Sequence, residues 1–65
     1  MMRRRVFNRV FEFVKIGDRI KVECMESHGR YRIEGRLTKI TEDGVLHLHN
    51  GFFQDYRTIM KIVKG

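Results

Sequence analysis

The chain is short and basic: it has 65 residues, 14 Lys and Arg against 8 Asp and Glu, and a formal net charge of +6. A chain of this length forms one domain and buries only ~60% of its unfolded surface, which leaves little room for a catalytic cleft. Its single cysteine, Cys24, excludes an intrachain disulfide and is typical of a reducing compartment.

No apolar run approaches the ~20 residues that cross a bilayer, and the arginine-rich start lacks the cleavage site of a signal peptide. We therefore expect a cytoplasmic protein with no membrane partner.

The positive charge is concentrated at the N-terminus. Four arginines precede the first acid, Glu12, whereas the remaining chain carries ten basic and eight acidic side chains. These arginines are Arg3, Arg4, Arg5 and Arg9. Such a cluster attracts phosphate backbones or acidic lipid surfaces. The alternative is a solvated helix start that only aids solubility.

Residues 1–16 form the predicted N-terminal arm. Apolar residues from Arg3 to Lys15 repeat with helical period. This apolar stripe consists of Val6, Phe7, Val10, Phe11, Phe13 and Val14. Because β-branched and aromatic residues are weak helix formers, packing must hold the helix in place. We expect a short helix that covers one open end of the following domain and ends at Gly17.

Residues 17–65 have the pattern of five β-strands. Alternating apolar residues predict strands at 19–25, 31–40, 45–49, 52–56 and 58–63, with glycine-bearing or short polar turns between them and a frayed end at 64–65. In the longest run, Gly35 is followed by a change of phase at Ile40, which is typical of a bend or bulge. Bent strands let a small sheet close on itself. The sequence therefore predicts a mostly β fold, a small five-stranded barrel with a short N-terminal α-helix.

Three segments carry a resemblance to the Sm-like family, which includes the Hfq-type proteins. Residues 33–37 and 45–50 resemble the first Sm motif, and residues 55–59 resemble the second motif in its Hfq-type form. The turn at 42–45 has no asparagine, and Thr58 stands where the Hfq-type pattern has histidine. The resemblance therefore implies an SH3-like or Sm-like barrel and a ring-like assembly more than a particular RNA specificity.

The candidate nucleic-acid site combines cations with one aromatic ring. Arg30, Arg32 and Arg36 recur along one side of the second predicted strand, with Glu34 between them. Tyr56 with Arg57 resembles a pair that stacks a base and neutralises its phosphate, although Tyr56 also fits a packing role at the barrel edge. The expected binding residues are Arg3, Arg4, Arg5, Arg9, Arg32, Arg36, Tyr56 and Arg57.

A subunit interface is expected beside the last two strands. Phe52 and Phe53 are adjacent, so one of them faces away from the core of a regular strand. A thin core and exposed edge strands both favour assembly. The expected interface residues of a homo-oligomeric ring are Phe52, Phe53, Tyr56, Ile59 and Met60.

The sequence offers little chemistry for catalysis. His47 and His49 share a strand face, but no third ligand lies at a recognisable spacing, so we expect no metal and no cofactor. No acid pair, triad or phosphate loop is present, and we expect no enzyme.

The leading hypothesis is RNA or single-stranded nucleic-acid binding by an oligomeric Sm-like barrel. The alternative is a protein-interaction module that captures an acidic peptide or a partner's strand. A duplex-coating protein is a third hypothesis, which the near-balanced charge of residues 17–65 disfavours.

Overall fold

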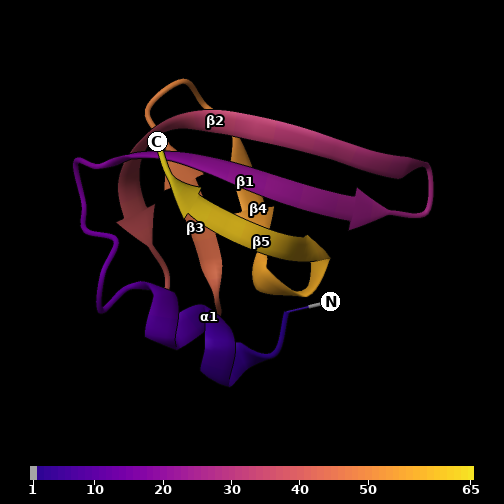
Figure 1. Cartoon of the computed structure of the whole chain (residues 1–65), viewed down its shortest axis with the longest axis horizontal. Helices are drawn as coiled ribbons and strands as arrows, with labels where there is room; N and C mark the ends of the chain where they lie inside the picture. The colour runs from indigo at the N-terminus through magenta and orange to yellow at the C-terminus, as the bar shows by residue number, and fades with distance from the viewer. Residues whose placement is uncertain (1) are drawn as a thin grey trace.

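The computed structural model describes residues 2–65 of the chain. These residues form α1 (Arg4–Val10), β1 (Arg19–Glu26), β2 (Gly29–Ile40), β3 (Val45–Leu48), β4 (Phe53–Asp55), the short 3-10 helix η1 (Tyr56–Thr58) and β5 (Ile59–Lys64) (Figure 1). The strands form one antiparallel sheet in the order β4-β3-β2-β1-β5. The prediction of a mostly β chain with an N-terminal helix is confirmed.

Helix α1 is shorter than the predicted segment 3–15, because it ends at Val10 and turns follow. No side chain caps its start and no acid lies in its first turn, so local interactions support it weakly. Phe7 and Val14 are buried as predicted, whereas Val6 is 46% and Phe13 75% exposed. The predictions that the helix reaches Gly17 and that Val6 and Phe13 pack inward are therefore wrong.

Strand β2 is shared between two parts of the sheet. Residues 29–36 pair with β1, in a hairpin that places Glu26 opposite Gly29, and residues 37–40 pair with β3. The register shifts between Leu37 and Lys39, which confirms the predicted change of phase before Ile40. Figure 1 shows β2 curving over the top of the molecule and down one side.

Gly35 lies before this shift and has a role that the sequence did not predict. A Cβ at Gly35 would lie 2.9 Å from Nδ2 of Asn50, and Asn50 donates a hydrogen bond of 2.9 Å to the Glu34 carbonyl. The glycine therefore admits the Asn50 side chain, which ties the turn after β3 to β2.

The end of the chain is better ordered than the predicted frayed end. Lys64 belongs to β5, and the Gly65 amide donates a hydrogen bond of 2.8 Å to the Arg19 carbonyl. Lys64 also forms an ion pair with Asp18, with 3.3 Å between Nζ and Oδ2. Both contacts extend the β1–β5 pairing beyond the predicted boundary.

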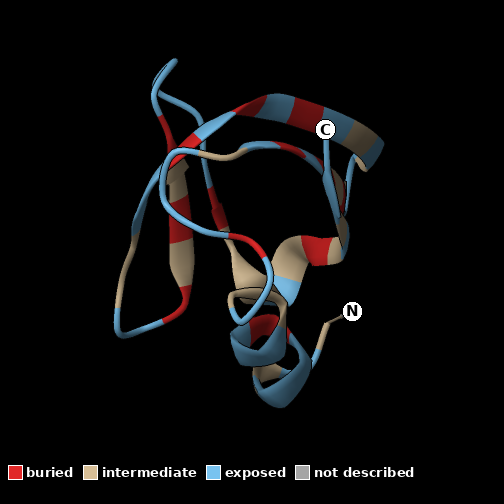
Figure 2. Ribbon diagram, turned by 60° about the vertical axis from the view of Figure 1, so that its left-hand side comes forward, coloured by how far each residue is buried: buried red, intermediate tan, exposed pale blue. Residues whose placement is uncertain are grey.

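The core lies between the curved strands and α1. Figure 2 shows buried and exposed residues alternating along the strands, as period-2 side-chain geometry requires. The fully buried members with the largest side chains are Phe7, Ile20, Val22, Cys24, Leu37, Leu46 and Ile59. Within residues 2–65, no helix is both long and apolar enough to span a membrane.

One buried polar side chain, Gln54 of β4, links separate parts of the sheet. Its Nε2 donates hydrogen bonds of 2.6 Å to the hydroxyls of Tyr31 in β2 and Thr58 in η1. Tyr31 in turn donates to the Glu26 carboxylate. Among the described residues no backbone pairing joins β4 to β5, so this network is a polar link from the edge strand β4 to β2 and to η1, which precedes β5.

Candidate nucleic-acid interface

Helix α1 and η1 bring two arginines from distant parts of the chain to one aromatic ring. The Arg4 guanidinium carbon lies 5.3 Å from the centroid of the Tyr56 ring, and that of Arg57 lies 5.8 Å from the same centroid. Both distances fit cation–π contacts. We call Arg4, Tyr56 and Arg57 the arginine cluster.

Tyr56 is anchored to the core beneath these cations. Its ring centroid lies 5.9 Å from that of Phe7, and a Cβ at Gly44 would lie 2.5 Å from its Cδ1 atom. The Tyr56 ring therefore packs directly against the Gly44 backbone, and residue 44 has no room for a side chain. This contact explains why the sequence places glycine at the end of the turn before β3.

Asp55 fixes Arg57 in place. The carboxylate accepts the Arg57 amide at 2.9 Å and the guanidinium at 3.0 Å through both Nε and Nη2. The Arg57 hydrogen bonds lower the pKa of the Asp55 carboxyl, and the same pair raises the pKa of Arg57. The Arg57 side chain is still 74% exposed, so its outer surface is open to a ligand.

Arg4 is held from the other side. It donates to the Glu42 carbonyl, and its Nε donates a hydrogen bond of 3.2 Å to the Asn8 side chain. The other arginines of the arm, Arg3, Arg5 and Arg9, are exposed. The ion pairs found in residues 2–65 are Arg57–Asp55 and Lys64–Asp18, so these three exposed cations have no acidic partner there.

The two remaining arginines of the predicted site lie elsewhere. Arg32 and Arg36 point outward from β2, opposite Glu23 and Arg19 of β1 respectively. The structure therefore does not place them in the arginine cluster. Lys21 and Lys61, which the sequence analysis did not single out, lie on the same outward side. Strand alternation is the signal that could have identified them.

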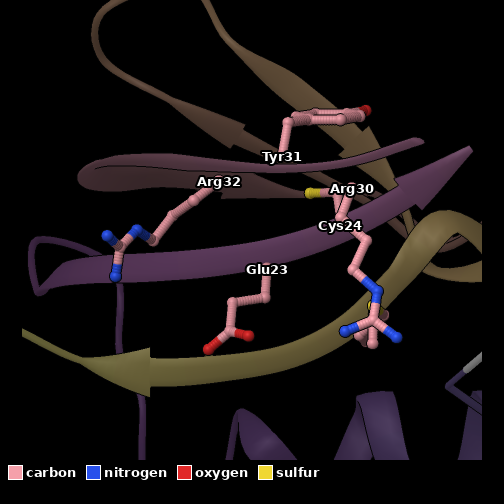
Figure 3. A pocket seen from close by; sticks show the side chains of 6 residues that line it. Glu23, Cys24, Arg30, Tyr31 and Arg32 are labelled. Atoms are coloured by element: carbon pink, nitrogen blue, oxygen red, sulfur yellow. The ribbon is translucent and has the colours of Figure 1, made fainter. Parts of the chain in front are cut away.

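A shallow depression of about 330 Å³ lies on this outward side, lined by Glu23, Cys24, Arg30, Tyr31, Arg32 and Met60. Figure 3 shows Glu23 between the two arginines, with Arg30 reaching across β1 to β5 and Tyr31 pointing the other way. Burial raises the pKa of the Cys24 thiol to about 11, so the thiol is protonated at neutral pH and is a poor nucleophile.

The predicted interface residues differ in accessibility. Phe52 and Phe53 are 53% and 64% exposed, and the Phe53 ring stacks on His47 of β3 with 5.7 Å between centroids. Ile59 is fully buried inside this chain, so only its backbone lies at the β5 edge. Met60 and Tyr56 are half-buried. In the described part of the chain, no group of three or more His, Cys, Asp or Glu side chains could hold a metal ion.

Comparison with known proteins gives no family assignment: no protein-family model matches the chain, and no significant match was found among curated proteins or solved structures.

Proposed function

We propose that this chain is a non-enzymatic protein that binds RNA or another single-stranded nucleic acid through its N-terminal arm and the arginine cluster. The observation that carries the proposal is the contact between α1 and η1, which gathers Arg4 and Arg57 on Tyr56 beside the exposed arm. A charge run that was merely solvated would not require Arg4 and Arg57 to converge on one ring, as they do here.

The parts of this surface take different roles. Arg3, Arg5 and Arg9 neutralise phosphates, which adds affinity without reading sequence. The exposed guanidinium plane of Arg57 offers a surface on which an unstacked base can lie. Because Arg4 and Arg57 lie against Tyr56, the ring serves to position both cations rather than to provide an open stacking face.

The same proposal includes a closed Sm-like barrel that assembles into a homo-oligomeric ring. The Gln54 network supports closure, because it joins β4 to β2 and η1 without strand pairing. β4 and β5 each have one edge that pairs with no other strand, although the Met2 amide donates a hydrogen bond of 2.9 Å to the Ile59 carbonyl at the start of β5. The rest of these edges supports assembly, because unpaired edges tend to pair with another chain. A ring multiplies the arms, and linked weak sites raise the overall affinity without new contacts.

Fluorescence anisotropy with labelled oligo-U and oligo-A tests the proposal, together with light scattering at low and high salt. We expect binding that weakens steeply with salt, and the triple variant Arg3→Gln/Arg5→Gln/Arg9→Gln should lower affinity ~10-fold or more for both oligonucleotides. Binding that does not depend on salt, or that the triple variant leaves unchanged, would contradict it. A monomer at both salt concentrations would contradict the ring.

The exposed Phe52 and Phe53 favour the second candidate, a protein-interaction module. Under that function, binding of an acidic peptide would survive neutralisation of the arm and would be lost in Phe53→Ser. The two candidates therefore differ in which substitution abolishes binding.

A further inference from the structure

The outward side of β1, β2 and β5 concentrates positive charge. Strand alternation buries Ile20, Val22, Ile33, Leu37 and Ile59 and turns their neighbours outward. Six exposed cations share this side, and we call them the basic face: Arg19, Lys21, Arg30, Arg32, Arg36 and Lys61. The same side carries two acids, Glu23 and Glu34. The near-balanced charge of residues 17–65 is therefore an average over unlike surfaces.

The basic face is poorly neutralised by its own sheet. Arg19 and Arg36 are direct cross-strand partners, an arrangement that destabilises a sheet because the like charges repel. The ion pairs found in residues 2–65 lie outside the basic face. Glu23 is opposite both Arg32 and Lys61 and is outnumbered by them. The repulsion between these cations lowers the stability of the fold. An anion bound to the basic face would explain why the chain carries them.

The dimensions of the face fit a polyanion. Alternate residues on one strand repeat every ~6.6 Å, so Arg30 to Arg36 on β2 spans ~20 Å. A duplex presents one phosphate per ~3.4 Å of axis on each strand, so that length passes about six phosphates of one strand. Arg30 also reaches across β1 to β5, and the Arg32 side chain extends over β1 (Figure 3). With Lys61 on β5, the positive surface extends across three strands.

Aromatic side chains are missing from this side. Every residue of β1, β2 and β5 is described, and their one aromatic residue, Tyr31, lies on the inward side with its hydroxyl bonded to Glu26 and Gln54. Sites for single strands combine a basic groove with aromatic rings on which bases stack. A face of cations alone can contact phosphates but offers no ring to an unstacked base.

We propose that the basic face binds the phosphate backbone of a nucleic-acid duplex. This goes beyond the proposed single-strand function and does not depend on it, because the arm and the arginine cluster lie on α1 and η1. Duplex DNA and duplex RNA present the same backbone chemistry, and the face is expected to take either with no base preference.

Two triple variants with the same loss of charge separate a site from a general charge effect. The face variant is Arg30→Gln/Arg32→Gln/Arg36→Gln and the arm variant is Arg3→Gln/Arg5→Gln/Arg9→Gln. Anisotropy is measured with ~16-bp DNA and RNA duplexes and an oligo-U strand of equal length, at about 50 and about 200 mM salt. Thermal melting checks folding, and the double variant Arg19→Gln/Lys61→Gln replaces the face variant if that fails to fold.

We expect the face variant to weaken duplex binding ~10-fold or more and to reduce the salt slope by about 2–3. The arm variant should weaken duplex binding by less than ~3-fold while it weakens oligo-U binding strongly. Equal effects of the two variants on the duplex, or no duplex binding at low salt, would overturn the proposal. Displacement of the duplex by polyglutamate at equal charge concentration would also overturn it, because that result would assign the face to an acidic polypeptide. If oligo-U binding alone fails, only the proposed single-strand function is lost.

Discussion

Arginines have partners in the arginine cluster, whereas two arginines of the basic face oppose each other. In the cluster, Arg57 has a carboxylate partner and Arg4 a carbonyl partner, and both lie against Tyr56. On the face, Arg19 and Arg36 oppose each other across the sheet. Counting cations therefore does not reveal what a surface does: the contacts of the cluster stabilise the fold, whereas the like-charge pair on the face destabilises it.

The largest expected effect tests how closely the cluster is fitted to the core. Gly44→Ala should destabilise the chain by about 3 kcal/mol, because alanine is strained at positive φ and its Cβ would overlap Tyr56. The φ of Gly44 is +89° and the contact is 2.5 Å. Urea unfolding measures the loss.

Gly51→Ala is the matched control for Gly44→Ala. The φ of Gly51 is +92°, but no atom lies within 4 Å of its added Cβ. We expect a cost of about 1 kcal/mol from the backbone alone. Equal costs at the two positions would show that Tyr56 is not packed on Gly44 as described.

Tyr56→Ala removes the centre of the cluster and leaves the face intact. The half-buried ring loses its contacts with Phe7 and both arginines, so the free energy of unfolding should fall by about 2 kcal/mol. Duplex binding should change little at temperatures where the variant is folded. An unchanged unfolding free energy would show that α1 is held by other contacts.

The five strands and their inward faces were predictable because side chains alternate between the two faces of a strand. A register shift of one residue would turn every buried side chain to the solvent, so the apolar pattern specifies which face is buried. The phase change before Ile40 was predicted for the same reason. The end of α1 at Val10 was not predicted, because helix length here depends on tertiary packing rather than on local signals. The role of Gly35 also escaped prediction, since it depends on Asn50, which is distant in sequence.

Of the candidate site, the arm and the Tyr56–Arg57 turn were recognisable as local clusters. Their meeting at Tyr56 was not, because it needs α1 to pack against η1. The row of arginines on β2 was recognised, but its continuation onto β1 and β5 was missed, because only the register of β1 with β2 and β5 brings these cations together. The net charge of a segment adds the cations of such a face to acids that lie on other surfaces, so the face does not show in the sum.

A smaller effect of the opposite sign is expected on the basic face. Arg36→Glu replaces a repulsive pair with an attractive one opposite Arg19, so the unfolding free energy should rise by about 0.5 kcal/mol. Duplex affinity should fall in the same variant. Arg30→Glu, an equal charge change on β2 opposite the uncharged Met25, serves as the control in thermal melting. A loss of stability in Arg36→Glu greater than in the control would remove the argument that the face is costly.

The smallest effect is the acid titration of the cluster. The Arg57 hydrogen bonds lower the pKa of Asp55 below its ordinary value of 3.8. A carboxyl with a lowered folded pKa stabilises the fold above its unfolded pKa, and this contribution is lost as the pH falls through the folded pKa. Arg57→Gln should raise the pKa of Asp55 and make the loss begin at higher pH.

Carbon-detected NMR titration of the carboxyl groups measures this shift. Asp18 is the internal control, because its pKa is lowered chiefly by the Lys15 backbone amide and should not respond to Arg57→Gln. A response of both carboxyls would indicate a change in the whole fold rather than at one ion pair.

The Gln54 carboxamide has a consequence for how the sheet opens. β4 has only three residues, and an edge strand of that length would ordinarily fray on its own. Separation of β4 would leave the Gln54 amide without its hydrogen-bond acceptors. It would at the same moment remove a donor from the hydroxyls of Tyr31 and Thr58. The edge is thereby coupled to the tip of the β1–β2 hairpin, and the backbone amides of both should exchange with deuterium as a single cooperative unit.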